Sequence, residues 1–324
     1  MMSHPILQVR GLSVTYGGPG GLVRAVDGID LCVGAGEVLG LVGESGSGKS
    51  TVASAVLGML PRTASVTGTV SIVGQDMLQL SVWERRRIRG KALTLVPQDP
   101  MTSLNPVLTV GYQLIETIRA HGRVREREAA ERAVEALRQV GIPDPRRALR
   151  RYPHEFSGGA RQRILIAAAL INAPELVIAD EPTSALDATV QRQVIEVLGT
   201  LVRNGHMAML LISHDLGVVA SLADRICVMY AGQLVEEGPT AGILERPQHP
   251  YTVALLAAAR GEAIALARFD ADARSLATCR LLPRCPIAVE VCRHGPPDLL
   301  AVGDQRFARC FVAQGVGGTT RGAV

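Results

Sequence analysis

A glycine-rich stretch at residues 43–51, GESGSGKST, has the residue types and spacing of a phosphate-binding loop. It fits the pattern G-x-x-x-x-G-K-[ST] and follows an apolar run, residues 38–42, that predicts a buried strand. Glycines let backbone N–H groups surround phosphate oxygens, and a following helix adds the positive end of its dipole. In such a loop Lys49 reaches the β- and γ-phosphates and the Ser50 hydroxyl binds Mg²⁺. The strand in front and the Gly-Lys-Ser ending argue against a turn that binds no ligand.

Polar residues end three further predicted strands. Asp180 and Glu181 end one apolar run, Gln98 ends a second and His214 ends a third. The carboxyl ends of parallel strands form the edge of an α/β sheet where one acid can position Mg²⁺ and another can activate water. The acids could instead cap a helix, and a lone histidine is often a core residue. Their shared position in strand–loop repeats after one phosphate loop favours the functional interpretation.

Two other features suit a nucleotide. Ser157, Gly158 and Gly159 begin a predicted helix and form a second possible anion site, although glycine-rich helix starts are common. Tyr16 ends a predicted strand and could stack on a base, with a half-buried structural tyrosine as an equal alternative.

The order of the predicted elements indicates an α/β fold. Strands are predicted at residues 6–9, 12–16, 24–31, 38–42, 67–74, 93–98, 176–181, 209–214, 226–230 and 233–237, the last two as a hairpin that closes the sheet. A helical block interrupts them between roughly residues 99 and 172. Its helix at residues 124–140 places Ala130, Val134, Leu137 and Val140 on one face. The basic residues between 82 and 91 lack interleaved aromatics, which favours a solvated helix face over a nucleic-acid surface.

Composition sets further limits. The 324 residues are 47% hydrophobic and 20% charged, enough for a substantial core, and the net charge of +4 is too small to indicate nucleic acid. No apolar run approaches the roughly 18 residues of a membrane span, and no signal peptide is expected at the N-terminus. We therefore expect a cytoplasmic protein whose six cysteines are thiols or metal ligands, with Cys32 and Cys227 in the core of strands.

In combination these motifs resemble the ATPase subunits of ATP-binding cassette (ABC) transporters over about residues 6–255, which predicts an ATPase domain at residues 1–255. The resemblance implies a P-loop ATPase with a RecA-like core, an N-terminal antiparallel β subdomain and a helical subdomain inserted at about residues 99–172. It also implies ATP and Mg²⁺ as cofactors.

The resemblance assigns roles to the nucleotide-site residues. Glu181 is the general base, His214 the switch histidine and Tyr16 the adenine-stacking residue. The Walker A loop contains Gly43, Ser45, Gly46, Gly48, Lys49, Ser50 and Thr51, and the Mg²⁺ contacts are Ser50, Gln98 and Asp180. The signature motif, which binds the γ-phosphate of ATP held by an opposite subunit, consists of Ser157, Gly158, Gly159 and Gln162, and Asp187 lies in the D-loop at residues 184–187.

A narrower resemblance is to the dipeptide/oligopeptide importers, through residues 96–106, residues 249–252 and a cysteine-bearing tail. It implies a peripheral subunit at the cytoplasmic face of the membrane. Its partners would be a second ATPase subunit (a paralogue or a second copy), two permease subunits and an extracytoplasmic peptide-binding protein, with no nucleic acid. Alternatives are another cargo such as nickel, or a soluble ABC ATPase acting on nucleic acid or ribosomes, whose usual second cassette or coiled-coil insertion is missing here. A P-loop kinase does not explain Ser157–Gly159.

The tail, residues 256–324, contains Cys279, Cys285, Cys292 and Cys310 in the spacing C-x5-C-x6-C-x17-C. Four thiolates suit a [4Fe–4S] cluster, with Zn²⁺ as the alternative, and a metal would stabilise so small a module. The resemblance to peptide importers favours the cluster. Small buried cysteines in a helical tail remain the structural alternative.

Overall fold

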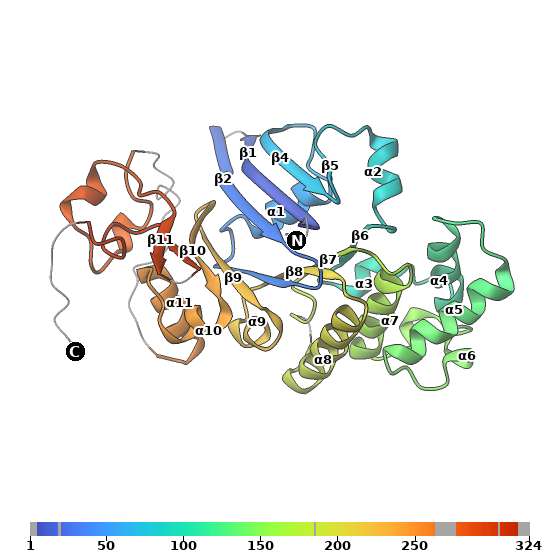
Figure 1. The fold of residues 1–324 in the computed structure, drawn as a ribbon. Coiled ribbons are helices and arrows are strands. Elements are labelled where there is room, and N and C mark those ends of the chain that lie inside the picture. The colour runs from blue at the N-terminus through green and yellow to red at the C-terminus, as the bar shows by residue number, and fades with distance from the viewer. Residues whose placement is uncertain (1–4, 19–20, 185, 263–276, 304, 317–324) are drawn as a thin grey trace.

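The computed structural model describes residues 5–18, 21–184, 186–262, 277–303 and 305–316. Within these ranges the strands form two sheets (Figure 1). The N-terminal sheet is antiparallel, with the order β2-β1-β4-β5. Its strands are β1 (Leu7–Gly18), β2 (Gly21–Val33), β4 (Ala64–Ile72) and β5 (Gln75–Asp76).

The second sheet is mixed and has the order β11-β12-β10-β9-β3-β8-β7-β6. Its parallel strands are β3 (Val38–Val42), β6 (Leu93–Val96), β7 (Leu176–Asp180), β8 (Ala208–Ser213) and β9 (Arg225–Tyr230). Its antiparallel strands are β10 (Gln233–Pro239), β11 (Leu300–Gly303) and β12 (Arg306–Ala308).

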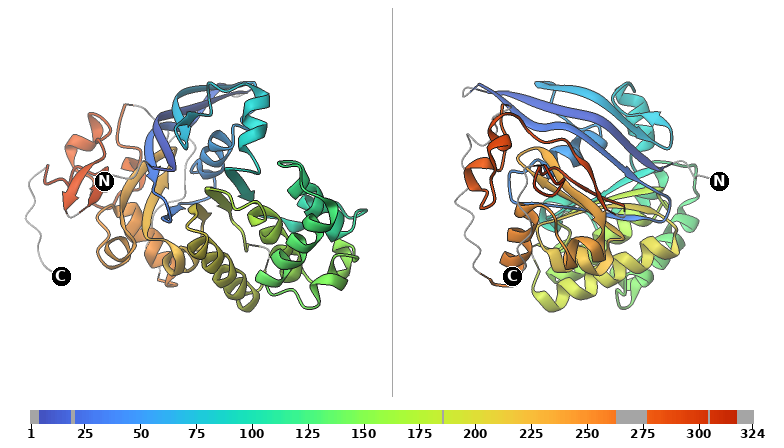
Figure 2. Two further views of the ribbon diagram at one scale, coloured as in Figure 1. Left: turned by 45° about the vertical axis from the view of Figure 1, so that its right-hand side comes forward. Right: turned by 60° about the vertical axis from the view of Figure 1, so that its left-hand side comes forward.

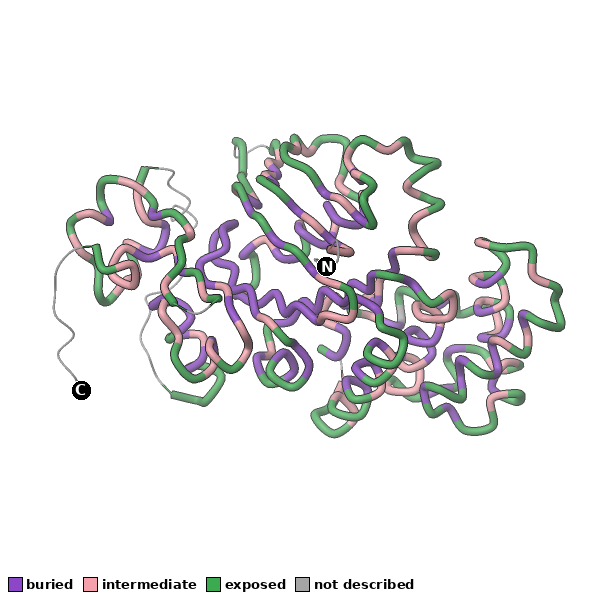
Figure 3. Tube along the Cα trace, viewed as in Figure 1, coloured by how far each residue is buried: buried purple, intermediate pink, exposed green. Residues whose placement is uncertain are grey.

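The central strands are buried on both faces, which explains their continuous apolar sequences. All five residues of β3 are buried, and alternate side chains enter different cores. Leu39 and Leu41 pack with the N-terminal sheet, whereas Val38 and Val42 pack toward the helices on the opposite face. Figure 3 shows this buried band running through the middle of the molecule. The loops at the carboxyl ends of these strands therefore start from a rigid base.

Helices cover both faces of the second sheet. In the described ranges the helices are α1 (Lys49–Val56), α2 (Val82–Ile88), α3 (Pro100–Ser103), α4 (Val110–Arg119), α5 (Glu126–Gln139), α6 (Pro145–Ala148), α7 (Gly158–Leu170), α8 (Ala188–Asn204), α9 (Leu216–Leu222), α10 (Thr240–Glu245) and α11 (Pro250–Ala259), with 3₁₀ turns η1 (Pro153–Glu155), η3 (Leu282–Arg284) and η4 (Glu290–Arg293). The helical block α3–α7 and the tail lie at opposite ends of the second sheet, as Figure 1 and the left view of Figure 2 show.

The α/β fold class predicted from the sequence is confirmed, and some details differ. Residues 6–9 and 12–16 belong to one strand, β1, rather than two. The strand continues because Gly11, at φ +55°, accommodates a bulge there and donates its N–H to Asp30 Oδ1 at 2.9 Å. The β9–β10 hairpin does not close the sheet, since β12 of the tail pairs with β10.

In α5 the buried face also differs slightly from the prediction. Ala129, Ala133, Val134 and Leu137 are buried, whereas Ala130 is only half-buried. The solvated helix expected among the basic residues is α2, in which no residue is buried. It starts with a capping box between Ser81 and Glu84. Across the described ranges, no helix has both the length and the apolar character needed to cross a membrane.

Candidate active site

The glycine-rich loop connects the buried strand β3 to α1, as its sequence predicts. Two of its glycines are required by their surroundings. A Cβ on Gly43 (φ +154°) would lie 2.1 Å from the carbonyl oxygen of Met229, and one on Gly48 (φ +110°) would lie 2.4 Å from that of Ala25. Gly48 is the N-cap of α1 and has no side chain to accept the first N–H groups of the helix. These N–H groups can therefore bind an anion.

Lys49 is folded back over this loop. Its side chain is 6% exposed, and its Nζ donates to the carbonyls of Gly43 at 2.7 Å and Glu44 at 2.9 Å. Burial lowers the pKa of Lys49, and the charges of Glu181, Asp180 and Glu44 partly offset that effect. A buried lysine beside carboxylates supplies a positive charge where phosphate oxygens would bind.

A cavity of about 290 Å³ opens beside the loop. Its lining residues are Val23, Ala25, Ser45, Gly46, Gly48, Lys49, Ser50, Thr51 and Glu181. The fold thus brings Glu181, from the end of β7, to the same cavity as the predicted phosphate-binding residues.

The carboxylate of Glu181 contacts two of the other predicted residues, Gln98 and His214. Its Oε2 accepts a hydrogen bond from Gln98 Nε2 at 3.1 Å, and its Oε1 lies 3.1 Å from Nδ1 of His214. Gln98 Nε2 also donates to Ser184 Oγ at 3.1 Å. These side chains come from the ends of β6, β7 and β8, which are adjacent in the sheet.

The backbone at Glu181 is strained. Its φ of +46° is uncommon for a residue with a side chain, and its N–H donates to the carbonyl of Ile212 in β8 at 2.8 Å. The neighbouring Asp180 is half-buried, and burial, with the adjacent Glu181 charge, raises its pKa while Lys49 lowers it. Two carboxylates and a lysine at one sheet edge form a site suited to a phosphate-bound cation and a polarised water.

The second predicted anion site is separate from this cavity. Ser157 caps α7 by accepting the N–H of Ala160 at 3.3 Å, and Ser157 and Gly158 are exposed. A Cβ on Gly159 would lie 2.3 Å from Val190 Cγ1, so this glycine allows α7 to approach α8 closely. None of the three lines the 290 Å³ cavity, and the arrangement leaves the start of α7 open to another molecule.

Three other predicted residues do not line this cavity. Gln162 is 1% exposed and its Nε2 donates to the carbonyl of Pro97 at 3.4 Å, so it points inward and links α7 to the strand end that bears Gln98. Tyr16 is half-buried opposite Val23 in the β1–β2 hairpin and is absent from the cavity lining. Asp187 caps α8 through the N–H groups of Thr189 and Val190, each at 3.1 Å.

Comparison with known proteins identifies the family. Residues 26–184 match the ABC transporter family, and residues 235–292 match the C-terminal region of oligopeptide/dipeptide transporters. The dipeptide transport ATP-binding protein DppD of Escherichia coli (strain K12) is 44% identical over 320 residues, which cover 94% of this chain and 96% of that protein. The chain belongs to the ABC transporter ATPases.

Other matches agree. The oligopeptide transport ATP-binding protein OppD of Salmonella typhimurium is 41% identical over 323 residues, or 95% of this chain and 94% of that protein. A solved dimeric structure of a bacterial ABC transporter cassette has a TM-score of 0.65 and 27% identity, and it covers 72% of this chain and 98% of that chain. As an ABC ATPase, the protein hydrolyses ATP with Mg²⁺.

The four tail cysteines gather in one module, but not as a compact metal site. The N–H of Cys279 donates to the carbonyl of Cys292 at 3.0 Å. Burial raises the pKa of Cys279 to about 11, and Cys292, Cys285 and Cys310 add to that rise. Among the residues that the structure describes, no group of three or more His, Cys, Asp or Glu side chains is placed to hold a metal ion. These residues therefore give no support to the expected [4Fe–4S] cluster or to its alternative, Zn²⁺.

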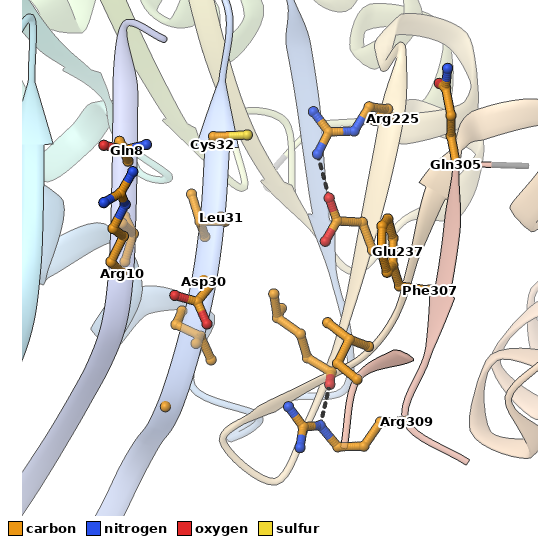
Figure 4. A pocket seen from close by; sticks show the side chains of 15 residues that line it. Gln8, Arg10, Asp30, Leu31, Cys32, Arg225, Glu237, Gln305, Phe307 and Arg309 are labelled. Carbon is orange, nitrogen blue, oxygen red and sulfur yellow. Dashed lines mark hydrogen bonds and ion pairs between the residues drawn. The ribbon is translucent and has the colours of Figure 1, made fainter. Parts of the chain in front are cut away.

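A larger cavity of about 710 Å³ lies between β1–β2 and β9–β12 (Figure 4). It contains the ion pair of Arg225 with Glu237 and none of the predicted nucleotide-site residues. Cys32, expected in the core, is exposed here, since β2 alternates and buries Leu31 and Val33 instead. Cys227 is buried, as expected.

Sequence reasoning missed four residues around the loop: Glu44, Tyr251, Arg280 and Arg284. Glu44 occupies a variable position of the loop pattern, and the partners of its N–H and of its carboxylate, Tyr251 and Arg284, lie more than 200 residues away in the sequence. In the sequence, only residues 249–252 pointed to any of these four, because they include Tyr251. The family resemblance gave them no role. Ala185 of the predicted D-loop and residues 263–276 of the predicted tail lie outside the described residues.

Proposed function

We propose that this ABC ATPase powers the import of dipeptides or oligopeptides through a membrane transporter. Both named relatives are peptide-transport ATP-binding proteins that match along nearly their whole length. The match to the oligopeptide/dipeptide transporter C-terminal region carries the cargo assignment, because it lies outside the part common to ABC ATPases. Nickel is the second candidate cargo.

In this proposal the site residues have the following roles. Lys49 and the N–H groups of Gly43, Ser45, Gly46, Gly48 and Thr51 bind the phosphates, while Ser50, Gln98 and Asp180 hold Mg²⁺. Glu181 polarises the attacking water, and His214 keeps Glu181 correctly positioned relative to the γ-phosphate. Tyr16 contacts adenine after a movement of the β1–β2 hairpin.

Hydrolysis requires two ATPase subunits. Ser157 and Gly158 are exposed, so we propose that they and Gly159 bind the γ-phosphate of ATP held by a second cassette, either a copy or a paralogue. Asp187 lies at that interface, and Gln162 supports the motif from within. Closure on ATP and opening after phosphate release would drive the transporter.

The other partners follow from the cargo. We propose two permease subunits and an extracytoplasmic peptide-binding protein, with this subunit at the cytoplasmic face of the membrane and without nucleic acid. Residues 1–255 would form the ATPase domain, and residues 256–324 a tail characteristic of peptide importers.

We also propose that Cys279, Cys285, Cys292 and Cys310 hold a [4Fe–4S] cluster that supports the tail. The support for this proposal is the number and spacing of the four cysteines, C-x5-C-x6-C-x17-C, since four thiolates are the usual ligands of such a cluster. Anaerobic purification followed by iron and sulfide analysis tests this: the full chain should contain both, and Cys292→Ser should contain neither. Absence of iron and sulfide from the full chain would refute it.

The transporter assignment is tested by capture from gently solubilised membranes. Glu181→Gln with ATP should trap the closed assembly, and mass spectrometry should find two polytopic permeases, a second cassette and a peptide-binding protein. Lys49→Ala is the control that should trap less. Ribosomal proteins or nucleic acid without any permease would contradict the proposal and favour a soluble ABC ATPase.

A further inference from the structure

Two arginines of the tail reach the phosphate loop. Arg280 and Arg284 lie in the tight turn between Cys279 and Cys285, which contains η3. The turn is fixed by backbone hydrogen bonds from the N–H of Leu282 to Cys279 and from the N–H of Arg284 to Leu281. Both arginine side chains are nearly buried, with exposures of 4% and 7%. Their positions are therefore set by the tail.

Arg284 binds the side chain of Glu44 with both of its terminal nitrogens. Nη1 lies 3.2 Å from Oε2 and Nη2 lies 3.3 Å from Oε1. Nη1 also donates to the Tyr230 hydroxyl at 3.4 Å, and the guanidinium lies over the Tyr230 ring. Burial alone would lower the pKa of Arg284, but these hydrogen bonds outweigh it and raise the pKa. A planar guanidinium fits a carboxylate in this way, whereas a lysine does not.

Glu44 is itself part of the phosphate loop. Its carbonyl accepts a hydrogen bond from Lys49 Nζ at 2.9 Å, and its N–H donates to the Tyr251 hydroxyl at 2.8 Å. The Tyr251 and Tyr230 rings are in contact, with centroids 4.6 Å apart. The backbone and the side chain of Glu44 are therefore held together by one tyrosine–arginine cluster.

Arg280 reaches the loop through a second route. It binds the carboxylate of Asp27 and the carbonyl of Ala231. Ala231 has a φ of +47° in the β9–β10 turn, and the next residue, Gly232, donates its N–H to the carbonyl of Ser47 at 2.8 Å. The tail thus supports the phosphate loop at two positions, Glu44 and Ser47.

We propose that Arg284 and Arg280 are positioning residues through which the tail holds the phosphate loop in the shape that binds ATP. Neither arginine lines the 290 Å³ cavity beside the loop. A loop that populates its binding shape only part of the time has an affinity reduced by that fraction. The inference rests on the protein being an ABC ATPase and is independent of the cargo.

The test is equilibrium binding of a non-hydrolysable ATP analogue to the full chain, together with the KM for ATP and kcat in the assembled transporter. Arg284→Met should weaken analogue binding at least about fivefold, the lower end of typical coupling between two sites. KM should rise by a similar factor while kcat changes less. Arg284→Lys should recover only part of the affinity.

Arg293→Met is the matched control, because Arg293 is an exposed tail arginine paired with Glu290 at 3.5 Å. The affinity and the melting temperature of Arg293→Met should equal those of the original chain. If Arg284→Met does not fold, Glu44→Gln breaks the same pair from the loop side and should give the same loss.

The double variant Glu44→Gln/Arg284→Met should be no weaker than the worse single variant. Unchanged affinity in a folded Arg284→Met or Glu44→Gln protein, or fully additive losses, would overturn the proposal. Failure of peptide import with these affinities intact would count only against the cargo assignment.

Discussion

Nδ1 of His214 lies 3.1 Å from Oε1 of Glu181, so two residues that follow adjacent strands are within hydrogen-bonding distance of each other. The histidine side chain is 60% exposed, whereas the glutamate side chain is 22% exposed. His214 is thus the more exposed partner of this pair and can hold the carboxylate in place.

His214→Ala should slow ATP hydrolysis while ATP still binds. Loss of a hydrogen bond to a charged group costs about 1.5–3 kcal/mol, which corresponds to a rate about 10- to 100-fold lower. Steady-state ATPase assays of the assembled transporter, with analogue binding measured in parallel, check this. An unchanged rate would show that His214 does not act on Glu181.

Gly48→Ala should remove ATP binding and destabilise the fold, because its Cβ would lie 2.4 Å from the carbonyl oxygen of Ala25. Gly46→Ala is the comparison: it has a φ of +80° but nothing within 4 Å. Gly46→Ala should therefore lower the free energy of unfolding only by the backbone strain, about 1–2 kcal/mol. Thermal melts and analogue binding distinguish the two, and equal losses would contradict the loop geometry.

His249 should make the fold sensitive to acid. It is fully buried at the start of α11, where it accepts the N–H of Tyr251 at 3.2 Å, and burial lowers its pKa from 6.5 to about 3. Between these values the unfolded chain binds a proton that the folded chain does not. The free energy of unfolding should therefore fall as the pH falls below 6.5, by at most about 1.4 kcal/mol per pH unit.

Denaturant titrations between pH 7 and pH 4 measure this slope. His249→Asn keeps a capping acceptor and should flatten it. His294→Asn, at an exposed tail histidine, should leave it unchanged. A slope that survives in His249→Asn would assign the acid sensitivity to other groups.

Cys32 should react with a thiol reagent before Cys227 in the folded protein. Cys32 is exposed in the cavity of Figure 4, whereas Cys227 is buried and its pKa is raised well above the usual value by burial. Kinetics of labelling should show a fast phase that is lost in Cys32→Ser and retained in Cys227→Ser. Persistence of the fast phase in Cys32→Ser would contradict the exposure of this strand face.

Much of the nucleotide site could be predicted from the sequence because its residues follow strands buried on both faces. The strand at residues 38–42 matches β3, and the polar residues after β6, β7 and β8 meet at one edge. The loop glycines could be predicted too, because a phosphate loop brings other backbone atoms too close for a side chain to fit.

Other features depended on contacts that no local pattern records. The inward direction of Gln162 is set by its packing against Pro97. The short strands β11 and β12 have no alternating pattern of useful length, and they form because β10 offers an edge. The pairing of Glu44 with Arg284 joins residues 240 positions apart.

The most direct test of the account is ATP hydrolysis by the assembled transporter that contains Glu181→Gln. The amide keeps the shape of the side chain but removes the charge that polarises water. We predict that turnover falls at least about 100-fold while ATP binding is retained. Undiminished turnover would contradict the placement of Glu181 as the catalytic base and the site built around it.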